Sequence, residues 1–273
     1  MKLENQSDFY LLNKPHSWTS QDLCTVFKKK YKFKKVGHSG TLDPNAEGLM
    51  LIATNKYTKL FDFIDNTHKT YEFEALFGFE SASFDTDSEL VEIETIDLEN
   101  KLDDLNKGIS ELTGNIKQVP PIYSAVKVKG KRLYKYARQE KEVELPIREV
   151  VVNNFKLISY EGNIGKFTAT VSKGTYIRSL IVDLAKSIGT KAVVSSINRI
   201  EIGTLNQNNT NVIKNIEQLD SKDAPEPLDW RLLFDIPIIS VEDDILNEIE
   251  NGNFLKSSLF GSDSPHIIEN KNS

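Results

Sequence analysis

Apolar and polar residues alternate most regularly in TYEFEALF, residues 70–77, where Tyr71 shares one face with two phenylalanines and glutamates occupy the other. Successive side chains of a β-strand point to opposite faces, so this pattern predicts a strand with one buried face. On that pattern alone, Tyr71 is interpreted as a core residue. Further strands are predicted at FYLLN, at LMLIA, and at residues 150–159, 165–172 and 193–203.

Apolar residues three or four positions apart predict four helices. Thr19 or Ser20 would cap the first of them, which is expected to run to about Lys30. The others are expected at residues 56–64, 102–112 and 176–188. Because strands and helices do not alternate regularly along the chain, their order indicates the α+β class.

The length of 273 residues allows one large domain with a small appendage. PEPLD, residues 225–229, is interpreted as the linker that leads to this appendage. We therefore expect a main domain over residues 1–237 and a short acidic C-terminal piece over residues 238–273. The last dozen residues are expected to be disordered.

Composition excludes several classes of protein. No apolar run is long enough to span a membrane, and the N-terminus lacks the basic and apolar pattern of a secretion signal. The single cysteine, Cys24, indicates a reducing compartment and lies in an apolar stretch, where a buried packing role is expected. The four histidines are scattered without the spacing of metal ligands. These features predict a cytoplasmic protein without a metal.

The net charge of −6 is unevenly distributed. Residues 217–273 hold 13 acidic and 4 basic side chains, a net of −9, which leaves +3 for the first 216 residues. Two basic clusters lie in that first part. One is KKKYKFKK at residues 28–35, and the other comprises Lys127, Lys129, Lys131, Arg132, Lys135 and Arg138, interleaved with tyrosines. Clustered bases with aromatics suit an RNA backbone with exposed bases, and two solvated faces explain the charge equally well.

The segment GHSGTLDPNAEG, residues 37–48, is a candidate site. Its glycines permit the close approach of a ligand, and Asp43 is held in an extended or turn conformation because Pro44 follows it. A lone Asp-Pro pair is also explained by a turn that the aspartate caps through its own backbone. The nucleophile elbow of serine hydrolases is absent, because it needs a glycine two residues after the serine and Thr41 stands there after Ser39.

Arg178, in SKGTYIRSL, falls in the first turns of the helix predicted at residues 176–188, where a cation opposes the helix dipole. An exposed arginine there costs only about a few tenths of a kcal/mol, so a solvated side chain is one explanation. The better explanation is an anionic partner, either a phosphate or a carboxylate such as Asp43.

Four segments, GHSGTLDPNAEG, HKTYEF, PPIYSAVKVKGKRLYKYAR and SKGTYIRSL, occur in the order and spacing typical of bacterial tRNA pseudouridine-55 synthases, the TruB family. NKPHSWTS, residues 13–20, also resembles the opening motif of that family, and the resemblance extends over residues 8–235. It implies a pseudouridine-synthase fold, in which a mixed, mostly antiparallel sheet is flanked by helices and RNA binds across a central cleft.

The implied reaction isomerises one uridine of the tRNA T loop to pseudouridine. The bond from ribose to the uracil nitrogen breaks, the base turns, and the same sugar carbon bonds to C5 of the ring. Nothing is oxidised, hydrolysed or transferred, so no cofactor is expected. The resemblance implies the T arm of tRNA as the partner of a monomeric protein that needs no obligate protein partner.

The resemblance also implies roles for three residues at the reacting centre. Asp43 matches the family's essential aspartate, which acts either as a nucleophile on the sugar or as a base that yields a glycal, and both routes stay open. Tyr71 matches the tyrosine that stacks on the base and assists loss of the C5 proton, in place of the core role above. Arg178 matches the arginine that pairs with the aspartate, and this pairing is expected to keep Asp43 ionised by lowering its pKa.

Four further residues are assigned to substrate binding. His38 matches the histidine that enters the space left by the flipped-out base, and Lys14 is expected to brace the site. Tyr176 belongs to SKGTYIRSL, and Ile197 matches an aliphatic position of the uracil pocket. Taken singly, His38 would be a turn histidine, Lys14 a surface lysine and Ile197 a core residue.

Residues 118–145 are implied to be an RNA-binding insertion that closes on the T arm through the second basic cluster. The chain departs from the family pattern at Ser17, where glycine is usual, and at Ser39, where threonine is common. The acidic C-terminal piece is too short to complete a PUA-type RNA-binding domain, so a truncated PUA-like remnant is expected. Two alternatives are a tRNA-folding chaperone, which would not need Asp43, and a pseudouridine synthase that acts on another RNA.

Overall fold

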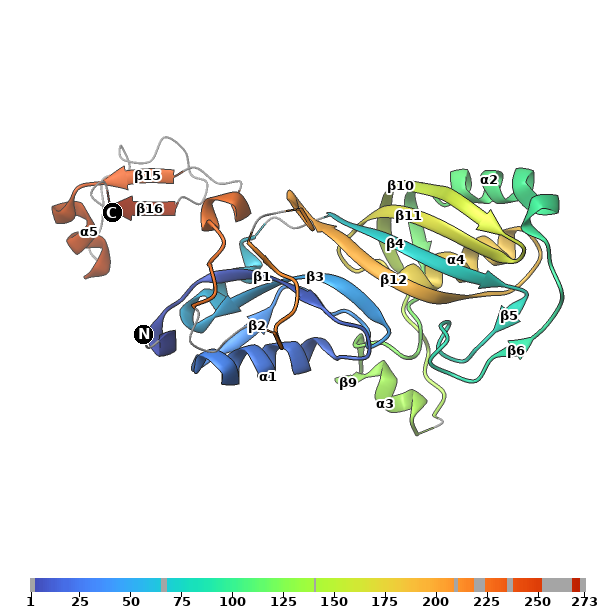
Figure 1. Ribbon diagram of the computed structural model, residues 1–273, viewed down its shortest axis with the longest axis horizontal. Coiled ribbons are helices and arrows are strands. Elements are labelled where there is room, and N and C mark those ends of the chain that lie inside the picture. The colour runs from blue at the N-terminus through green and yellow to red at the C-terminus, as the bar shows by residue number, and fades with distance from the viewer. Residues whose placement is uncertain are drawn as a thin grey trace.

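The computed structural model describes residues 3–64, 68–139, 141–208, 211–218, 224–234, 238–251 and 267–270. A ten-stranded mixed sheet runs through the molecule (Figure 1). Eight strands follow one another across it in the order β14 (Val212–Ile213), β1 (Phe9–Lys14), β3 (Ala46–Thr54), β12 (Ala192–Ile202), β4 (His68–Phe77), β11 (Ile164–Ser172), β10 (Arg148–Glu161) and β7 (Gly114–Gln118). The other two are β2 (Val36–His38), which pairs with β3, and β13 (Leu205–Asn206), which pairs with β12.

Neighbouring strands are antiparallel except at two places. β14 runs parallel to β1, and β12 runs parallel to β3. The second of these contacts joins the β1–β3 half of the sheet to the half formed by β4, β11, β10 and β7. The predicted α+β class with a mixed, mostly antiparallel sheet is therefore confirmed.

The two apolar runs FYLLN and LMLIA lie in strands β1 and β3, which are buried on both faces. Alternate residues of β1 pack on one side with α1 (Ser20–Tyr31) and on the other with the 3-10 helices η2 (Asn55–Asp62) and η4 (Trp230–Leu233). Burial on both faces removes the need for alternation and explains the continuous apolar sequence. The short helix predicted at residues 56–64 is observed as η2, a 3-10 helix that begins one residue earlier and ends two residues earlier.

The first helix begins with a capping box. Thr19 is the N-cap: its hydroxyl accepts a hydrogen bond from the Asp22 N–H at 3.0 Å, and its own N–H donates to the Asp22 carboxylate at 2.9 Å. Of the two predicted caps, the structure therefore selects Thr19. Cys24 lies on the buried face of this helix, which confirms its predicted packing role.

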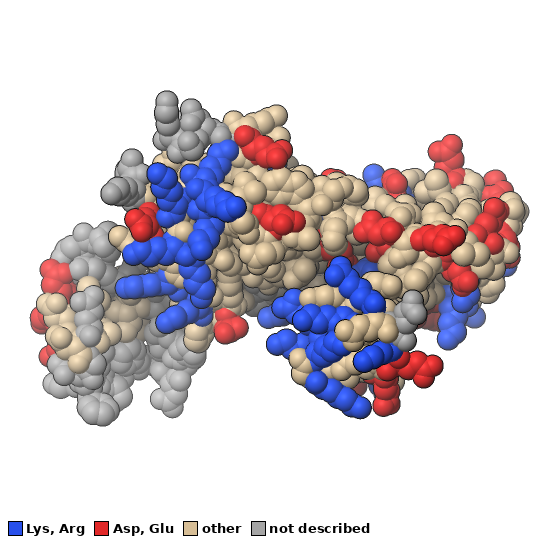
Figure 2. All heavy atoms as spheres, turned by 90° about the horizontal axis from the view of Figure 1, so that it is seen from below, with Lys and Arg blue, Asp and Glu red and all other residues tan. Residues whose placement is uncertain are grey.

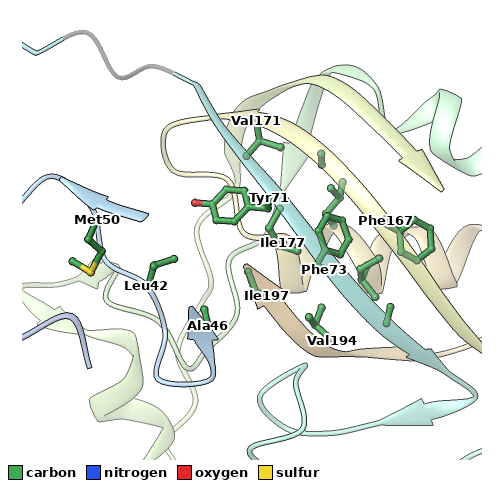
Figure 3. Packing of buried hydrophobic residues seen from close by; sticks show 14 of the residues in the cluster. Leu42, Ala46, Met50, Tyr71, Phe73, Phe167, Val171, Ile177, Val194 and Ile197 are labelled. Atoms are coloured by element: carbon green, nitrogen blue, oxygen red, sulfur yellow. The ribbon is translucent and has the colours of Figure 1, made fainter. Parts of the chain in front are cut away.

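Helices α2 (Leu102–Glu111) and α4 (Ile177–Ser187) pack together and cover the half of the sheet that contains β4, β10 and β11 (Figure 1). The 3-10 helix η3 (Leu98–Lys101) leads into α2, and another, η1 (Leu3–Asn5), precedes β1. The main core lies between these helices and the sheet. Figure 3 shows Phe73, Phe167 and Val194 of this core pointing toward one another from three strands.

Two excursions leave the sheet. The hairpin β5 (Phe79–Glu80) and β6 (Val91–Glu92) follows β4, and its loop bonds to β12 through Phe84 and Thr86. The predicted insertion between β7 and β10 forms a small lobe of β8 (Lys127–Val128), β9 (Lys131–Arg132) and α3 (Leu133–Ala137). This lobe stands out from the sheet beside the start of α1 (Figure 1).

The C-terminal part contains β15 (Ile238–Val241), α5 (Asp243–Glu250) and β16 (Ile267–Asn270). β15 and β16 pair in parallel, away from the ten-stranded sheet (Figure 1). Of the last dozen residues, for which disorder is predicted, residues 267–270 form β16 and the others lie outside the described residues. The boundary predicted at residue 237 adjoins residues 235–237, which also lie outside them. In the described ranges, no helix is both long and apolar enough to traverse a bilayer.

Candidate active site

A cavity of about 240 Å³ opens where the loop 39–43 meets β4, β12 and the start of α4. Its walls are formed by Ser39, Gly40, Thr41, Leu42, Asp43, Ala46, Lys69, Tyr71, Ala125, Ser172, Lys173, Gly174, Thr175, Tyr176, Ile177, Arg178 and Ile197. The structure thus brings together five of the seven residues predicted to react with or bind the substrate, namely Asp43, Tyr71, Tyr176, Arg178 and Ile197. They come from segments as far apart in the sequence as residues 43 and 197.

Asp43 and Arg178 form the charged centre of the cavity. The Arg178 Nη2 donates a hydrogen bond to Asp43 Oδ2 at 2.6 Å, so the expected pairing of Arg178 with this carboxylate is present. Arg178 is only 3% exposed, whereas a third of the Asp43 side chain is exposed. Backbone carbonyls of Ser83 and Tyr123 accept two more hydrogen bonds from the guanidinium, at 2.7 and 3.0 Å. Arg178 is therefore held from three directions, and it presents Asp43 to the cavity.

A second carboxylate, Asp85, shares the same guanidinium. Its Oδ2 lies 3.3 Å from Arg178 Nη1, and the Asp85 side chain is almost fully buried. It also accepts hydrogen bonds from the Ser83 hydroxyl and from the backbone N–H of Asp87. The sequence analysis missed Asp85, because the residue heads a run of acidic and polar residues in which no local pattern marks it as buried.

The pKa of Asp43 is raised above its ordinary value. Burial is the largest cause, and the nearby Asp85 adds to it, while Arg178 opposes both. The expectation that Arg178 would lower the pKa of Asp43 is therefore wrong in its net direction, because one guanidinium shared between two carboxylates does not offset the loss of water. A raised pKa makes the ionised Asp43 carboxylate a stronger base.

The loop that carries Asp43 is fixed by hydrogen bonds on both sides. The Ser20 hydroxyl, at the start of α1, donates to the Leu42 carbonyl at 3.0 Å and accepts from the Leu42 N–H at 2.8 Å. On the other side, the Ser17 N–H donates to the Pro44 carbonyl at 2.9 Å. Ser17 has a φ of +67°, a left-handed conformation that favours glycine, so the serine holds this turn under strain.

Lys14 is buried in the wall behind this loop and does not line the cavity. Its Nζ donates to the carbonyls of Pro15, Trp18 and Pro44 at 2.9, 2.6 and 3.2 Å, which joins the segment before α1 to the residue after Asp43. Burial lowers the pKa of Lys14 to about 8, and the charge of Asp43 counteracts this shift. The structure places Lys14 as a positioning residue, consistent with a brace and inconsistent with a surface lysine.

Tyr71 and Ile197 belong to the core and to the cavity at once. Tyr71 is 8% exposed and Ile197 6%, on the neighbouring strands β4 and β12. In Figure 3 the Tyr71 ring extends from β4 with its hydroxyl directed away from Phe73 and Phe167. Tyr71 is therefore a core residue, as its pattern predicts, and it also lines the cavity, because the apolar face of β4 becomes the cavity wall at its N-terminal end.

Tyr176 and His38 occupy different positions relative to the cavity. Tyr176 is the N-cap of α4 and lines the cavity; its backbone N–H and carbonyl are held by the Gln118 side chain at 2.8 and 3.1 Å. His38 ends β2 and does not line the cavity, although its loop neighbours Ser39 and Gly40 do. Burial, with Arg199 nearby, lowers the pKa of His38, so its imidazole is neutral at pH 7.

The six bases of the second cluster all lie on the lobe of β8, β9 and α3 (Figure 2). Two of them lie over tyrosine rings: Lys131 Nζ is 4.7 Å from the Tyr136 ring centre, and the Arg138 guanidinium is 5.6 Å from that of Tyr134. Figure 2 shows a second group of lysines and arginines on the same face, over the end of α1. Both predicted basic clusters are therefore presented on one side of the molecule.

Two buried cations near the cavity, Lys69 and Arg199, have no role in the sequence analysis, which quoted Lys69 only within HKTYEF. Both occupy inward-facing positions of strands that are otherwise apolar there, Lys69 next but one to Tyr71 and Arg199 next but one to Ile197. A charged residue in such a position is a signal that could have identified them. In the described part of the chain, no three His, Cys, Asp or Glu side chains are grouped so as to hold a metal ion.

Comparison with solved structures finds chains of similar fold. A chain of a Cbf5–Nop10–Gar1 complex matches with a TM-score of 0.58 and 26% identity, over 78% of this chain and 53% of its own length. A chain of the archaeal box H/ACA sRNP Nop10–Cbf5 complex matches with a TM-score of 0.62 over 93% of this chain and 70% of that one, at 18% identity, so this second likeness supports the fold alone.

The sequence comparisons define the family. The model "TruB family pseudouridylate synthase (N terminal domain)" matches residues 28–177, so the chain belongs to the TruB family of pseudouridylate synthases, as the resemblance of its motifs predicted. Its relatives include the tRNA pseudouridine synthase B of Mesoplasma florum, 38% identical over 91% of this chain and 85% of that protein, and that of Bacillus cereus, 36% identical over 91% and 84%. The chain is thus an isomerase that converts uridine to pseudouridine.

Proposed function

We propose that this protein isomerises uridine-55 in the T loop of tRNA to pseudouridine and that Asp43 is the carboxylate that acts on the ribose. The relatives that match over most of the chain are named tRNA pseudouridine synthases. The observation that carries the assignment of Asp43 is its partly exposed carboxylate, held at 2.6 Å by a buried arginine, in a cavity large enough for one nucleobase.

The chemistry needs few groups, and the cavity supplies them. The bond from C1′ to N1 breaks, the uracil rotates in place, C1′ bonds to C5, and the C5 proton leaves. Arg178 binds Asp43 through Oδ2, which leaves Oδ1 for the sugar. That oxygen either bonds to C1′ or removes the C2′ proton to give a glycal, and the proposal includes both routes. Tyr71 forms the wall on which the rotating ring stacks and lies beside the departing C5 proton.

The cavity accepts a base only after the base has left its stack. Extrusion of a nucleotide costs about a few kcal/mol, which the enzyme must recover through contacts with the bound RNA. In this proposal His38, neutral and next to the cavity rim, fills the space that the uridine leaves. Tyr176 and Ile197 hold the uracil from the sides. The protein would act as a cytoplasmic monomer, on tRNA alone, without a cofactor.

The function is tested with a tRNA transcript that carries tritium at C5 of its uridines. We expect release of the tritium of one uridine per tRNA, because isomerisation must expel the hydrogen at C5 of the reacting ring. A transcript with cytidine at position 55 should release none. Release that persists from the cytidine transcript would show that the target uridine is another one, and no release from either would overturn the proposed activity. Since the assay contains no second RNA or protein, it also decides whether a guide is needed.

The proposed RNA contact of the basic lobe gives a second expected result. Replacing Lys127 and Lys135 together by alanine should reduce the slope of log affinity against log salt by about 0.9 for each phosphate contact that is lost. Lys107→Ala with Lys186→Ala, on α2 and α4, changes the net charge equally and is the matched control. Filter binding of tRNA between low and moderate salt gives the slopes. Equal slopes for the two double variants would contradict an RNA-binding role for the lobe.

A further inference from the structure

Two buried cations border the cavity where the loop passes over the sheet. Lys69 of β4 is 7% exposed and lines the cavity, and Arg199 of β12 is 1% exposed. Gly40 lies over both: a Cβ on this residue would be 2.6 Å from Lys69 Nζ and 3.7 Å from Arg199 Nη1. The two nitrogens therefore face the same point, at the edge of the space that holds Asp43 and Tyr71.

One nitrogen of the Arg199 guanidinium has no hydrogen-bond partner at that point among the described residues. Its Nε donates to the Leu49 carbonyl at 2.6 Å and its Nη2 makes a long contact of 3.4 Å with the Gly40 carbonyl. Its Nη1, although buried, has no hydrogen-bond partner among the described residues. The Ser39 hydroxyl, which also lines the cavity, is likewise buried and unpartnered within the described ranges. Unpartnered buried donors are rare, and they indicate a group that the free protein lacks.

No anion in the described structure balances Lys69. It has neither a hydrogen bond nor an ion pair there, and the charges that act on it, Arg199 and Lys173, are both positive. Burial and these two cations lower the pKa of Lys69 to about 7. The nearest acid along β12, Glu201, bonds to Thr70, which lies on the other face of β4. In contrast, the buried Arg178 in the same cavity faces two carboxylates.

We infer that Lys69 and Arg199, with the Ser39 hydroxyl, form a subsite for a backbone phosphate adjacent to the target uridine. The inference rests on the proposed function, because it takes the ligand of the cavity to be RNA. Lys69 and Tyr71 are two residues apart on one strand face, about 7 Å, which is the scale of a single nucleotide. A base stacked on Tyr71 therefore places its own phosphodiester group near Lys69. The phosphate supplies the negative charge and the acceptor oxygens that these donors lack.

The subsite also explains the glycine at position 40. A side chain there would enter the space between the loop and the two cations. With only hydrogen on Cα, the loop backbone approaches both cations closely, while Lys69 still lines the cavity. The same residues thus hold the phosphate and, through the Arg199 contact with the Gly40 carbonyl, the loop that carries Asp43.

The test changes the charge on the RNA and on the protein separately. A T-arm stem-loop is made with a neutral methylphosphonate at the linkage 5′ or 3′ to the target uridine, and its binding is measured with wild type, Lys69→Met and the exposed-lysine control Lys107→Met. We expect one of the two neutral linkages to weaken binding to wild type and to Lys107→Met by about tenfold. Lys69→Met should bind the unmodified stem-loop about tenfold more weakly and lose little more with the neutral linkage.

The melting temperatures of wild type and Lys69→Met are measured alongside their binding. Because Lys69→Met removes an unbalanced buried charge, the free protein should melt at a higher temperature than wild type. Unchanged wild-type affinity for both neutral linkages, or an additive loss in Lys69→Met, would overturn the subsite. The neutral-linkage arm with wild type does not depend on how well the variant folds. These binding results are independent of tritium release, so failure of the isomerase assay is distinguished from failure of the subsite.

Discussion

Replacing Asp43 by asparagine should reduce the rate of pseudouridine formation by about 10³-fold or more, while the affinity for tRNA stays close to that of wild type. Asparagine has nearly the same shape and keeps a carbonyl oxygen that accepts the hydrogen bond from Arg178 Nη2. It lacks the negative charge, so it neither forms an ester-like bond with C1′ nor removes the C2′ proton. The substitution should therefore reduce the turnover rate and leave the affinity for tRNA nearly unchanged.

The fold around the substituted residue should persist. The loop is held by Ser20, Ser17 and Lys14 through backbone groups of Leu42 and Pro44, and none of these contacts uses the Asp43 carboxylate. Arg178 keeps Asp85 as its second partner. An unchanged unfolding midpoint in urea is thus the control for this variant.

The measurement is single-turnover tritium release with wild type and Asp43→Asn side by side, together with tRNA binding by both. A variant that binds poorly would mean that Asp43 lies at the phosphate contacts. A variant that retains full isomerase activity would exclude Asp43 as the reacting carboxylate. The same pair separates the enzyme from a tRNA-folding chaperone, because refolding of a misfolded tRNA by a chaperone does not require this carboxylate.

Replacing Arg178 by methionine should destabilise the fold by about 3–5 kcal/mol and abolish measurable activity near neutral pH. The arginine is buried, and its removal leaves two carboxylates facing each other without a cation, together with two unpaired backbone carbonyls. Arg178→Lys keeps the charge but not the planar fork that reaches Asp43, Asp85 and the two carbonyls, so it should recover stability only in part.

The pH dependence of this variant has a definite sign. Arg178 opposes the upward shift of the Asp43 pKa, so without it that pKa rises further. An acid whose pKa is higher in the folded than in the unfolded state binds more protons when folded. Stability then falls as the pH rises from the ordinary value of 3.8 through the raised one. The loss of folding stability caused by Arg178→Met should therefore be smaller at pH 5 than at pH 8.

Urea unfolding of wild type, Arg178→Met and Arg178→Met/Asp85→Asn at both pH values checks this result. The double variant removes one of the two unbalanced carboxylates and should regain part of the stability, with no gain in activity. Equal losses at pH 5 and pH 8, or no recovery in the double variant, would mean that Arg178 stabilises the fold through packing and not through its charge.

Much of the local structure could be predicted from the sequence because it depends on neighbours within a few residues. The alternation in β4 follows from one buried and one half-exposed face, and the Thr19 cap follows from the two orphan N–H groups that it and Asp22 satisfy. Short strands such as β2, β7 and β14 were not predicted. Two to five residues carry too little pattern, and these strands exist because an edge of the sheet is available to them.

The motifs alone were sufficient to identify the family and to select Asp43, Tyr71 and Arg178, and the structure then brought the three to one cavity. The sequence did not reveal Asp85 or the direction of the Asp43 pKa. Asp85 meets Arg178 across 93 positions of the chain because the β5–β6 loop bonds to β12 beside α4. A pKa depends on how much water is removed and on every charge brought near, and these are properties of the assembled fold.

The sequence by itself determined the strands, the helix caps, the family and the residue types at the reacting centre, because each is encoded in local periodicity or in contiguous motifs. Only the tertiary structure decided which charges are balanced. By packing two loops against α4 it gave Arg178 two carboxylates, whereas the described structure gives Lys69 and Arg199 none. Electrostatic balance is a sum over groups distant in sequence, and that sum takes its value only when the chain has folded.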